Sequence, residues 1–178
     1  MAQTETVLLD REAIRRVITR ITHEILEKNK GCQGLVLMGI RSGGDHLASL
    51  IRQRIADIEG AEVPQGAIDV TLYRDDVATG QPRPVGKTDI PCALDGRHVI
   101  LVDEVIYTGR TIRAAMDALM DIGRPGSVQL AVLIDRGHRE LPIRPDYIGR
   151  NVPTARDEQI LVNFDAAQQP IDVRLIKP

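Results

Sequence analysis

Two kinds of apolar pattern alternate along most of this chain. Uninterrupted apolar runs lack the in–out alternation of a half-exposed strand, so they predict strands covered on both faces, at 35–38, 99–102 and 128–134. Apolar residues spaced three or four apart predict amphipathic helices, at 14–25, 47–58 and 112–119. Strands that alternate with helices indicate an α/β fold whose mainly parallel, twisted sheet is flanked by helices.

Weaker patterns complete this outline. Asp10 has the residue type that caps a helix N-terminus, and Gly31 stands where the first helix should end. Ile68, Val70 and Leu72 alternate with polar residues, which predicts a strand with one more exposed face. Shorter strands are predicted near 147–148, 160–162 and 173–176.

The composition predicts one domain that spans residues 1–178. Hydrophobic residues make up 43% of the chain, which is enough for a single full core. The segment 74–96 is rich in proline, glycine and charge, but the chain on both sides of it reads as one fold. We therefore expect a flexible flap there and not a linker between domains.

Charge and cysteine content narrow the class of protein. A net charge of −2 gives no global preference for nucleic acid, so an RNA partner would need a local basic patch. No apolar run is long enough to span a bilayer, and the polar N-terminus shows no secretory signal. Cys32 and Cys92 are too few for a disulfide framework or a metal site. We expect a cytoplasmic protein without a membrane partner.

The stretch from 99 to 111 carries the strongest chemical signal. An apolar strand leads into Asp103 and Glu104, and a polar loop at 108–111 then opens a helix. Backbone N–H groups at a helix N-terminus favour an anion, threonine hydroxyls add donors, and Gly109 lets the backbone approach closely. This order predicts a site for a phosphorylated sugar, whose hydroxyls and bound Mg²⁺ would partner the carboxylates. The alternative is an ordinary strand-to-helix connection with a solvated acidic rim.

Two other loops should belong to the same site. Ligands of open parallel sheets bind beyond the carboxyl ends of the strands, so loops 39–44 and 135–139 should converge with 107–111. Arg41 and backbone donors of the first loop would hold an anion. The flap, with Arg74 and Asp75, would close over the sugar and exclude water from the reacting centre.

The strand, the acidic pair and the Thr-Gly loop resemble the phosphoribosyl-pyrophosphate (PRPP) motif of type I phosphoribosyltransferases. The resemblance implies that family's fold, with a flexible flap and a small hood. It also implies that loop 39–44 binds pyrophosphate, that the loop after Ile106 binds the 5′-phosphate, and that the loop after Ile134 faces the base. Asp103, Glu104 and Arg41 are the expected catalytic residues, and the two carboxylates would hold Mg²⁺. Substrate contacts are expected from Ile40, Arg41, Ser42, Gly43, Arg74, Asp75, Asp103, Glu104, Val105, Ile106, Tyr107, Thr108, Gly109, Arg110, Thr111, Arg136 and Ile160.

Two residues bear on the choice of base. In hypoxanthine-guanine phosphoribosyltransferases the residue matching Tyr107 is usually Asp, and a tyrosine is not anionic near neutral pH. The chain therefore departs from the purine pattern, although Tyr107 can also be read as packing beside the loop. Arg136 either serves the base pocket or structures its own loop by pairing with Asp135 or a backbone carbonyl.

Further sequence segments resemble those of the PyrR family, and with them the resemblance covers nearly the whole chain. These segments lie at 13–17, 19–21, 23–24, 29–31, 71–76, 135–143, 146–149 and 151–154. PyrR proteins are pyrimidine-operon attenuation regulators that also convert uracil and PRPP to UMP and pyrophosphate. The resemblance implies UMP or UTP as effectors, pyr operon leader mRNA as a partner, and a homodimer or higher homo-oligomer. The alternatives are an enzyme without RNA regulation, and a regulator that turns over poorly.

Two positions depart from the family pattern. The usual acidic pair is Asp-Asp, and here Glu104 supplies the longer carboxylate. Many members carry Thr-Arg-Gly in the pyrophosphate loop, where this chain has Ser42, Gly43 and Gly44. One arginine is thus missing, which affects the expected efficiency with PRPP more than nucleotide binding.

One face of the first helix is the candidate RNA-binding surface. At roughly 100° per residue, Arg16, Arg20 and His23 fall on one stripe opposite the apolar face, and Thr19 flanks it. Cationic and hydroxyl donors suit phosphate and 2′-hydroxyl contacts, although a charged helix face is most often only solvated. The expected RNA-binding residues are Arg16, Thr19, Arg20, His23, Lys28, Arg139, Arg144 and Arg150.

Overall fold

A five-stranded parallel sheet forms the centre of the molecule in the computed structural model, which describes residues 3–73 and 86–178. All four neighbouring pairs of strands run parallel. The strand order is β3 (Gln65–Ile68), β2 (Leu35–Ile40), β4 (His98–Ile106), β5 (Ser127–Asp135) and β6 (Tyr147–Asn151). The prediction of an α/β fold with a mainly parallel sheet is confirmed.

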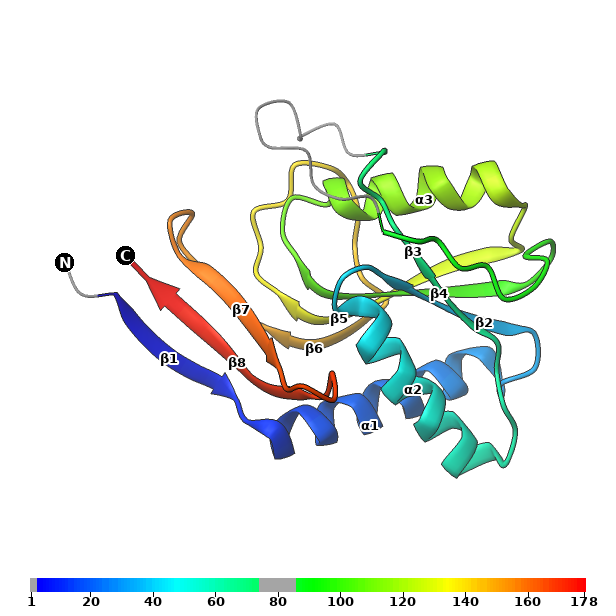
Figure 1. Cartoon of the computed structure of the whole chain (residues 1–178), viewed down its shortest axis with the longest axis horizontal. Helices are drawn as coiled ribbons and strands as arrows, with labels where there is room; N and C mark the ends of the chain where they lie inside the picture. The colour runs from blue at the N-terminus through cyan, green and yellow to red at the C-terminus, as the bar shows by residue number, and fades with distance from the viewer. Residues whose placement is uncertain (1–2, 74–85) are drawn as a thin grey trace.

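Helices cover both faces of this sheet (Figure 1). Helices α1 (Arg11–Asn29) and α2 (Gly44–Glu59) pack on one face, and α3 (Arg110–Ile122) packs on the other. Along β4, Ile100 and Val102 join the cluster under α1 and α2, whereas Val99 and Leu101 join the cluster under α3. Because both faces are covered, residues 99–102 of β4 form an uninterrupted apolar run in the sequence.

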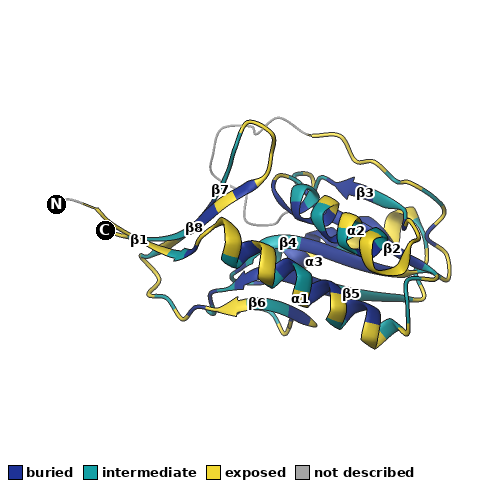
Figure 2. Ribbon diagram, turned by 90° about the horizontal axis from the view of Figure 1, so that it is seen from below, coloured by how far each residue is buried: buried dark blue, intermediate teal, exposed yellow. Residues whose placement is uncertain are grey.

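The first helix shows how the sequence sets the ends of an element. The side chain of Asp10 accepts a hydrogen bond from the backbone N–H of Ala13 at 2.8 Å, as expected of an N-cap. The helix ends at Asn29, and Lys30 takes the left-handed conformation that stops it. Figure 2 shows the buried positions of α1 turned toward the sheet and the exposed positions turned away.

A second, antiparallel sheet forms the hood. It consists of β1 (Thr4–Leu9), β8 (Pro170–Lys177) and β7 (Gln159–Phe164), in that order. Figure 1 places it beside the ends at which β5 and β6 finish. The sequence did not predict β1, because most of its residues are exposed and it is held by pairing with β8.

Two sequence predictions need correction. The strand expected over Ile68, Val70 and Leu72 is instead β3, which ends at Ile68, and the chain then turns. The predicted flap at 74–96 extends too far toward the C-terminus, because residues near its end belong to the folded core. Asp89 pairs with Ala67 through two backbone hydrogen bonds of 2.7 and 3.0 Å, and Leu94 is 1% exposed in the core. Residues 74–85, including Arg74 and Asp75, lie outside the described residues.

In the part of the chain that the structure describes, no helix has both the length and the apolar character needed to cross a membrane.

Candidate functional site

The loops that follow β2, β4 and β5 meet at one edge of the parallel sheet, as the sequence predicted. Hydrogen bonds tie the loop after β5 directly to the loop after β4. The backbone N–H groups of Glu140 and Leu141 donate to the carbonyl of Thr108, and the Arg139 guanidinium donates to the carbonyl of Tyr107 at 2.7 Å. The two loops therefore form one wall of the site.

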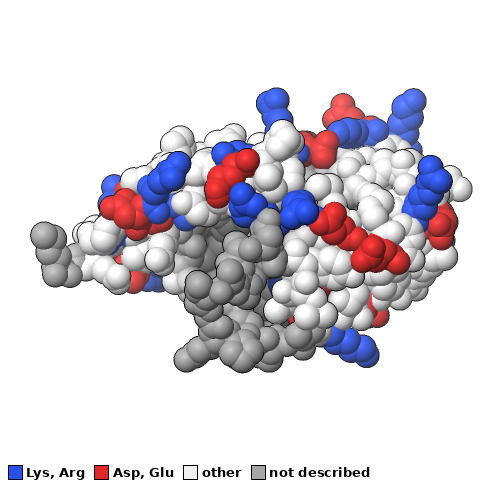
Figure 3. Space-filling view, turned by 90° about the horizontal axis from the view of Figure 1, so that it is seen from above, with Lys and Arg blue, Asp and Glu red and all other residues white. Residues whose placement is uncertain are grey.

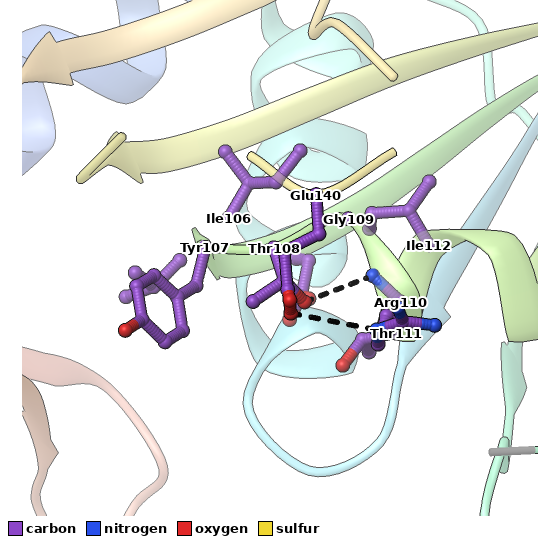
Figure 4. Close-up of a pocket in the computed structure, with 10 residues that line it drawn as sticks. Ile106, Tyr107, Thr108, Gly109, Arg110, Thr111, Ile112 and Glu140 are labelled. Atoms are coloured by element: carbon purple, nitrogen blue, oxygen red, sulfur yellow. Dashed lines mark hydrogen bonds and ion pairs between the residues drawn. The ribbon is translucent and has the colours of Figure 1, made fainter. Parts of the chain in front are cut away.

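A pocket of about 220 Å³ lies at the N-terminus of α3 (Figure 4). Gly109 precedes the helix with φ of +93°, a conformation that L side chains rarely adopt. The Thr108 hydroxyl accepts a hydrogen bond from the N–H of Arg110, and the Arg110 side chain pairs with Glu140 at 3.6 Å. The pocket is lined by Asp103, Val105, Ile106, Tyr107, Thr108, Gly109, Arg110, Thr111, Ile112 and Glu140.

The two carboxylates of the motif do not lie together in this pocket. Both belong to strand β4, where the sequence analysis placed them beyond the strand, and consecutive side chains of a strand point to opposite faces. Asp103 lines the pocket, whereas the Glu104 carboxylate lies against Gly43 of the preceding loop. The expected acidic rim beside the phosphate loop is therefore supplied by Asp103.

Glu104 is in an environment that disfavours its charged form. Burial raises its pKa to about 8, with further contributions from the negative charges of Asp103 and Asp45. With no cation beside it, this carboxyl is largely protonated at neutral pH. Among the described residues, no cluster of three or more histidine, cysteine or acidic side chains is placed to hold a metal ion.

Loop 41–44 packs tightly over the end of β4. A Cβ on Gly43 would overlap the Glu104 carboxylate, and a Cβ on Gly44 would overlap the carbonyl of Val102. The two departures from the family pattern, a glycine at 43 and a glutamate at 104, are thus in direct contact. Any side chain at position 43 would need space that the Glu104 carboxylate occupies.

The guanidinium of Arg41 already has protein partners. It donates to the Asp45 carboxylate at 3.2 Å and to the backbone carbonyl of Lys87 at 2.6 Å. The N–H of Gly43 also donates to Asp45, at 3.0 Å. Sequence reasoning missed Asp45, whose only signal was an acidic residue in the first turn after a glycine-rich loop.

Arg136 structures the loop across from the phosphate pocket. It is 8% exposed, and it donates to the Thr154 hydroxyl and to the carbonyls of Ala155 and Glu158 at 2.7 to 3.2 Å. Its guanidinium also lies 4.0 Å from the centre of the Tyr107 ring. The second reading of Arg136, as a residue that organises a loop, therefore fits the structure, although its partners lie at 154–158.

Tyr107, Asp135 and Ile160 have different surroundings. Tyr107 packs between Arg136 and His138, whose ring centre is 5.6 Å away, so its ring both lines the pocket and braces the loop after β5. Asp135 pairs with Arg139 at 2.7 Å and not with Arg136. Ile160 lies in β7 of the hood and packs, partly buried, on the cluster under α1 and α2.

The basic stripe of α1 lies along a hollow of about 560 Å³. Arg16, Arg20 and His23 are exposed and Thr19 is half-buried, as the helical geometry predicted. Two further arginines line the hollow, Arg15 on α1 and Arg54 on the neighbouring α2. Sequence reasoning missed Arg54, because only the packing of α2 against α1 brings it there.

The other predicted RNA-binding residues are dispersed. Arg139 belongs to the wall of the candidate site, where it pairs with Asp135 and donates to the carbonyl of Tyr107, and it does not line the hollow along α1. Arg144 lines a separate hollow with Arg139 beside β6. Lys28 pairs with Asp146 at 2.9 Å, and Arg150 donates to the carbonyl of Leu8 at 2.7 Å.

Arg20 has a structural role as well. Its guanidinium donates to the backbone carbonyls of Ile148 and Gly149, at 3.1 and 2.6 Å, and pairs with Glu24. Arg20 therefore links α1 to strand β6.

Seen from the α3 side of the molecule, lysine and arginine side chains are interspersed with acidic ones (Figure 3).

The chain matches the family model of the phosphoribosyl transferase domain over residues 5–166. It is 63% identical to the "Bifunctional protein PyrR" of Geobacter sulfurreducens over 173 residues, which are 97% of this chain and 98% of that protein. It is 54% identical to the Bacillus subtilis protein of the same name over 168 residues, 93% of each. The solved hypoxanthine phosphoribosyltransferase of Trypanosoma cruzi superposes with a TM-score of 0.74 over 97% of both chains at 22% identity. That likeness confirms the fold, and together these findings show that the chain belongs to the PyrR family of phosphoribosyltransferases.

Proposed function

We propose that this protein is a uracil phosphoribosyltransferase that also regulates the pyrimidine biosynthetic operon, by binding its leader mRNA in response to uridine nucleotides. The enzymatic half rests on one observation: the phosphate pocket at 103–112, loop 41–44 and loop 135–143 meet at one sheet edge. The relatives that share most of this chain are named as bifunctional PyrR proteins.

The proposed reaction transfers a ribose phosphate from PRPP to uracil. A bond forms between N1 of uracil and C1′ of the ribose as the bond from C1′ to the diphosphate oxygen breaks. The bonding electrons leave with diphosphate, and the N1 proton passes to water. The pocket at the N-terminus of α3 holds the 5′-phosphate through backbone N–H groups and the hydroxyls of Thr108 and Thr111. Loop 41–44, with Arg41, faces the leaving diphosphate.

Asp103 is the residue that fits a Mg²⁺ ion bound with PRPP. Mg²⁺ keeps several waters and takes one or two protein carboxylates together with substrate oxygens. Asp103 meets that need, whereas the other acidic residue of the pocket, Glu140, pairs with Arg110. Glu104 fits less well, since its carboxylate is turned to Gly43 and does not line the pocket. When bound, Mg²⁺ offsets the negative charge that develops on the leaving diphosphate.

The test of the enzymatic half is an assay of UMP formation from uracil and PRPP with Mg²⁺. Asp103→Asn should lower kcat/KM for PRPP by about a hundredfold, the loss typical of removing one preorganised electrostatic group. Asp117→Asn is the matched control, because Asp117 is half-exposed in the middle of α3 and pairs with Arg113. Wild-type turnover by Asp103→Asn would remove Asp103 from the site, and absence of UMP formation by the natural protein would overturn the activity itself.

The regulatory half rests on the hollow along α1, where Arg15, Arg16, Arg20 and Arg54 gather with His23. Four arginines in one hollow give a basic patch on a chain of net charge −2, and its donors suit phosphate and 2′-hydroxyl groups. A titration of the pyr leader RNA, with and without UMP, tests this half. Binding that is absent in both conditions would leave an enzyme without RNA regulation.

The proposed function also implies a cellular location and an oligomeric state. The leader RNA and the nucleotide substrates meet in the cytoplasm, and we place the protein there. A homodimer or higher homo-oligomer would let the α1 hollows of two subunits face one RNA. Sedimentation of the protein with and without the leader RNA measures the stoichiometry.

A further inference from the structure

Asp45, the second residue of helix α2, holds both anion-binding groups of loop 41–44. One carboxylate oxygen accepts the N–H of Gly43 at 3.0 Å, and the other accepts the guanidinium of Arg41 at 3.2 Å. The side chain of Asp45 is only 13% exposed, so this arrangement is largely shielded from water. Gly43 and Arg41 are the donors that the proposed function assigns to diphosphate.

The carboxylate of Asp45 has the same chemistry as the group that the loop would bind. A backbone N–H and a guanidinium on two oxygens of one anion is the arrangement by which proteins hold phosphate and carboxylate groups alike. Among the described residues, Arg41 also donates to the uncharged carbonyl of Lys87, and Asp69 lies near enough to interact with its charge, but Asp45 is the carboxylate that is hydrogen-bonded to it. The Asp45 carboxylate therefore neutralises the cation of the loop.

A second acidic residue lies beside the same loop. Glu104 lies against Gly43 and feels the fields of both Asp45 and Asp103, which together with burial raise its pKa. An incoming diphosphate would meet one cation that is already paired. For an anion to bind in the loop, the contacts of Asp45 with Gly43 and Arg41 must first break.

We propose that Asp45 is a positioning residue that occupies the anion donors of loop 41–44, and that the diphosphate group binds by displacing its carboxylate. The inference rests on the proposed phosphoribosyltransferase function. The Asp45 carboxylate then lowers the affinity of the site for PRPP and pyrophosphate, so loop 41–44 binds anions less tightly than its sequence alone implies. A purely structural role, in which Asp45 only shapes the loop for its ligand, makes the opposite prediction.

The experiment compares Asp45→Asn with the natural protein. Asparagine keeps the size and the hydrogen bond to Gly43 but removes the charge, so the dissociation constant of inorganic pyrophosphate should fall about five- to tenfold. The KM for PRPP should fall by a similar factor while kcat changes less than about twofold. Calorimetric titration with pyrophosphate in Mg²⁺ buffer gives the first quantity, and initial rates give the others.

Two further variants make the test decisive. Asp45→Ser also removes the charge and still offers an oxygen to the loop N–H, so it substitutes if the asparagine variant does not fold. Asp117→Asn removes the acidic partner of another arginine four residues away, on α3, and should leave both constants unchanged. Unchanged or weaker binding of pyrophosphate by folded, uncharged variants would overturn the inference. A natural protein that makes no UMP and binds no pyrophosphate would instead overturn the proposed function.

Discussion

Arg136 gives the sharpest test of how the site is held together. Arg136→Met removes the guanidinium but keeps an unbranched apolar side chain of similar length in a position that is 8% exposed. The variant loses three hydrogen bonds to residues 154–158, and the carbonyls of Ala155 and Glu158 lose a charged donor. It also loses the contact of the guanidinium with the Tyr107 ring at 4.0 Å.

The expected loss of stability follows from these contacts. A hydrogen bond from a charged donor contributes about 1.5 kcal/mol or more, and the two bonds to backbone carbonyls account for about 3 kcal/mol. The bond to the Thr154 hydroxyl and the cation–π contact add about 1 kcal/mol together, while the methionine side chain regains part of the buried apolar contact. We therefore expect Arg136→Met to lower the free energy of unfolding by about 3 kcal/mol.

Urea unfolding followed by circular dichroism measures this loss. Arg156→Met is the matched control, since Arg156 is an exposed arginine in the segment 154–158 that Arg136 contacts. This control should change the free energy of unfolding by no more than about 0.5 kcal/mol. The KM for uracil should rise in Arg136→Met, because the loop that faces the proposed base site is released. A folded Arg136→Met variant within about 1 kcal/mol of the natural protein would refute the structural role. Loss of activity at full stability would assign the side chain to substrate.

The remaining predictions concern Glu104 and the RNA face. Because the pKa of Glu104 rises from 4.5 to about 8 on folding, the folded state holds a proton that the unfolded state releases between these values. The stability that the neutral Glu104 side chain contributes is complete below pH 4.5 and is lost as the pH rises through about 8. Measured with a metal chelator present, the free energy of unfolding of the natural protein should therefore fall by about 5 kcal/mol relative to that of Glu104→Gln over this range; a difference that does not change with pH would contradict the burial. Arg16→Ala should weaken leader-RNA binding about tenfold at unchanged UMP formation, and equal loss of both activities would reject the α1 hollow. Arg16 is preferable to Arg20, which also anchors β6.

The sequence by itself determined the architecture of the core and the location of the pocket at the N-terminus of α3. Strands covered on both faces must be apolar throughout, and helices on a sheet must show a three-to-four residue period, so β2, β4, β5 and the helices were visible as patterns. The pocket at 108–111 was visible too, because an anion site at a helix N-terminus is built from consecutive residues.

Contacts between distant segments were decided only by the tertiary structure. The partners of Arg136 lie about twenty residues downstream, and β1 is a strand only because β8 pairs with it. The turn of Glu104 toward Gly43 depends on which sheet face each side chain of β4 takes, and on how closely loop 41–44 approaches that strand. Local patterns record the face that a residue buries, whereas the identity of its partner depends on how the loops pack. For that reason the hydrogen bonds of Asp45 to Arg41 and Gly43 follow only from the tertiary structure, although these residues are close in sequence.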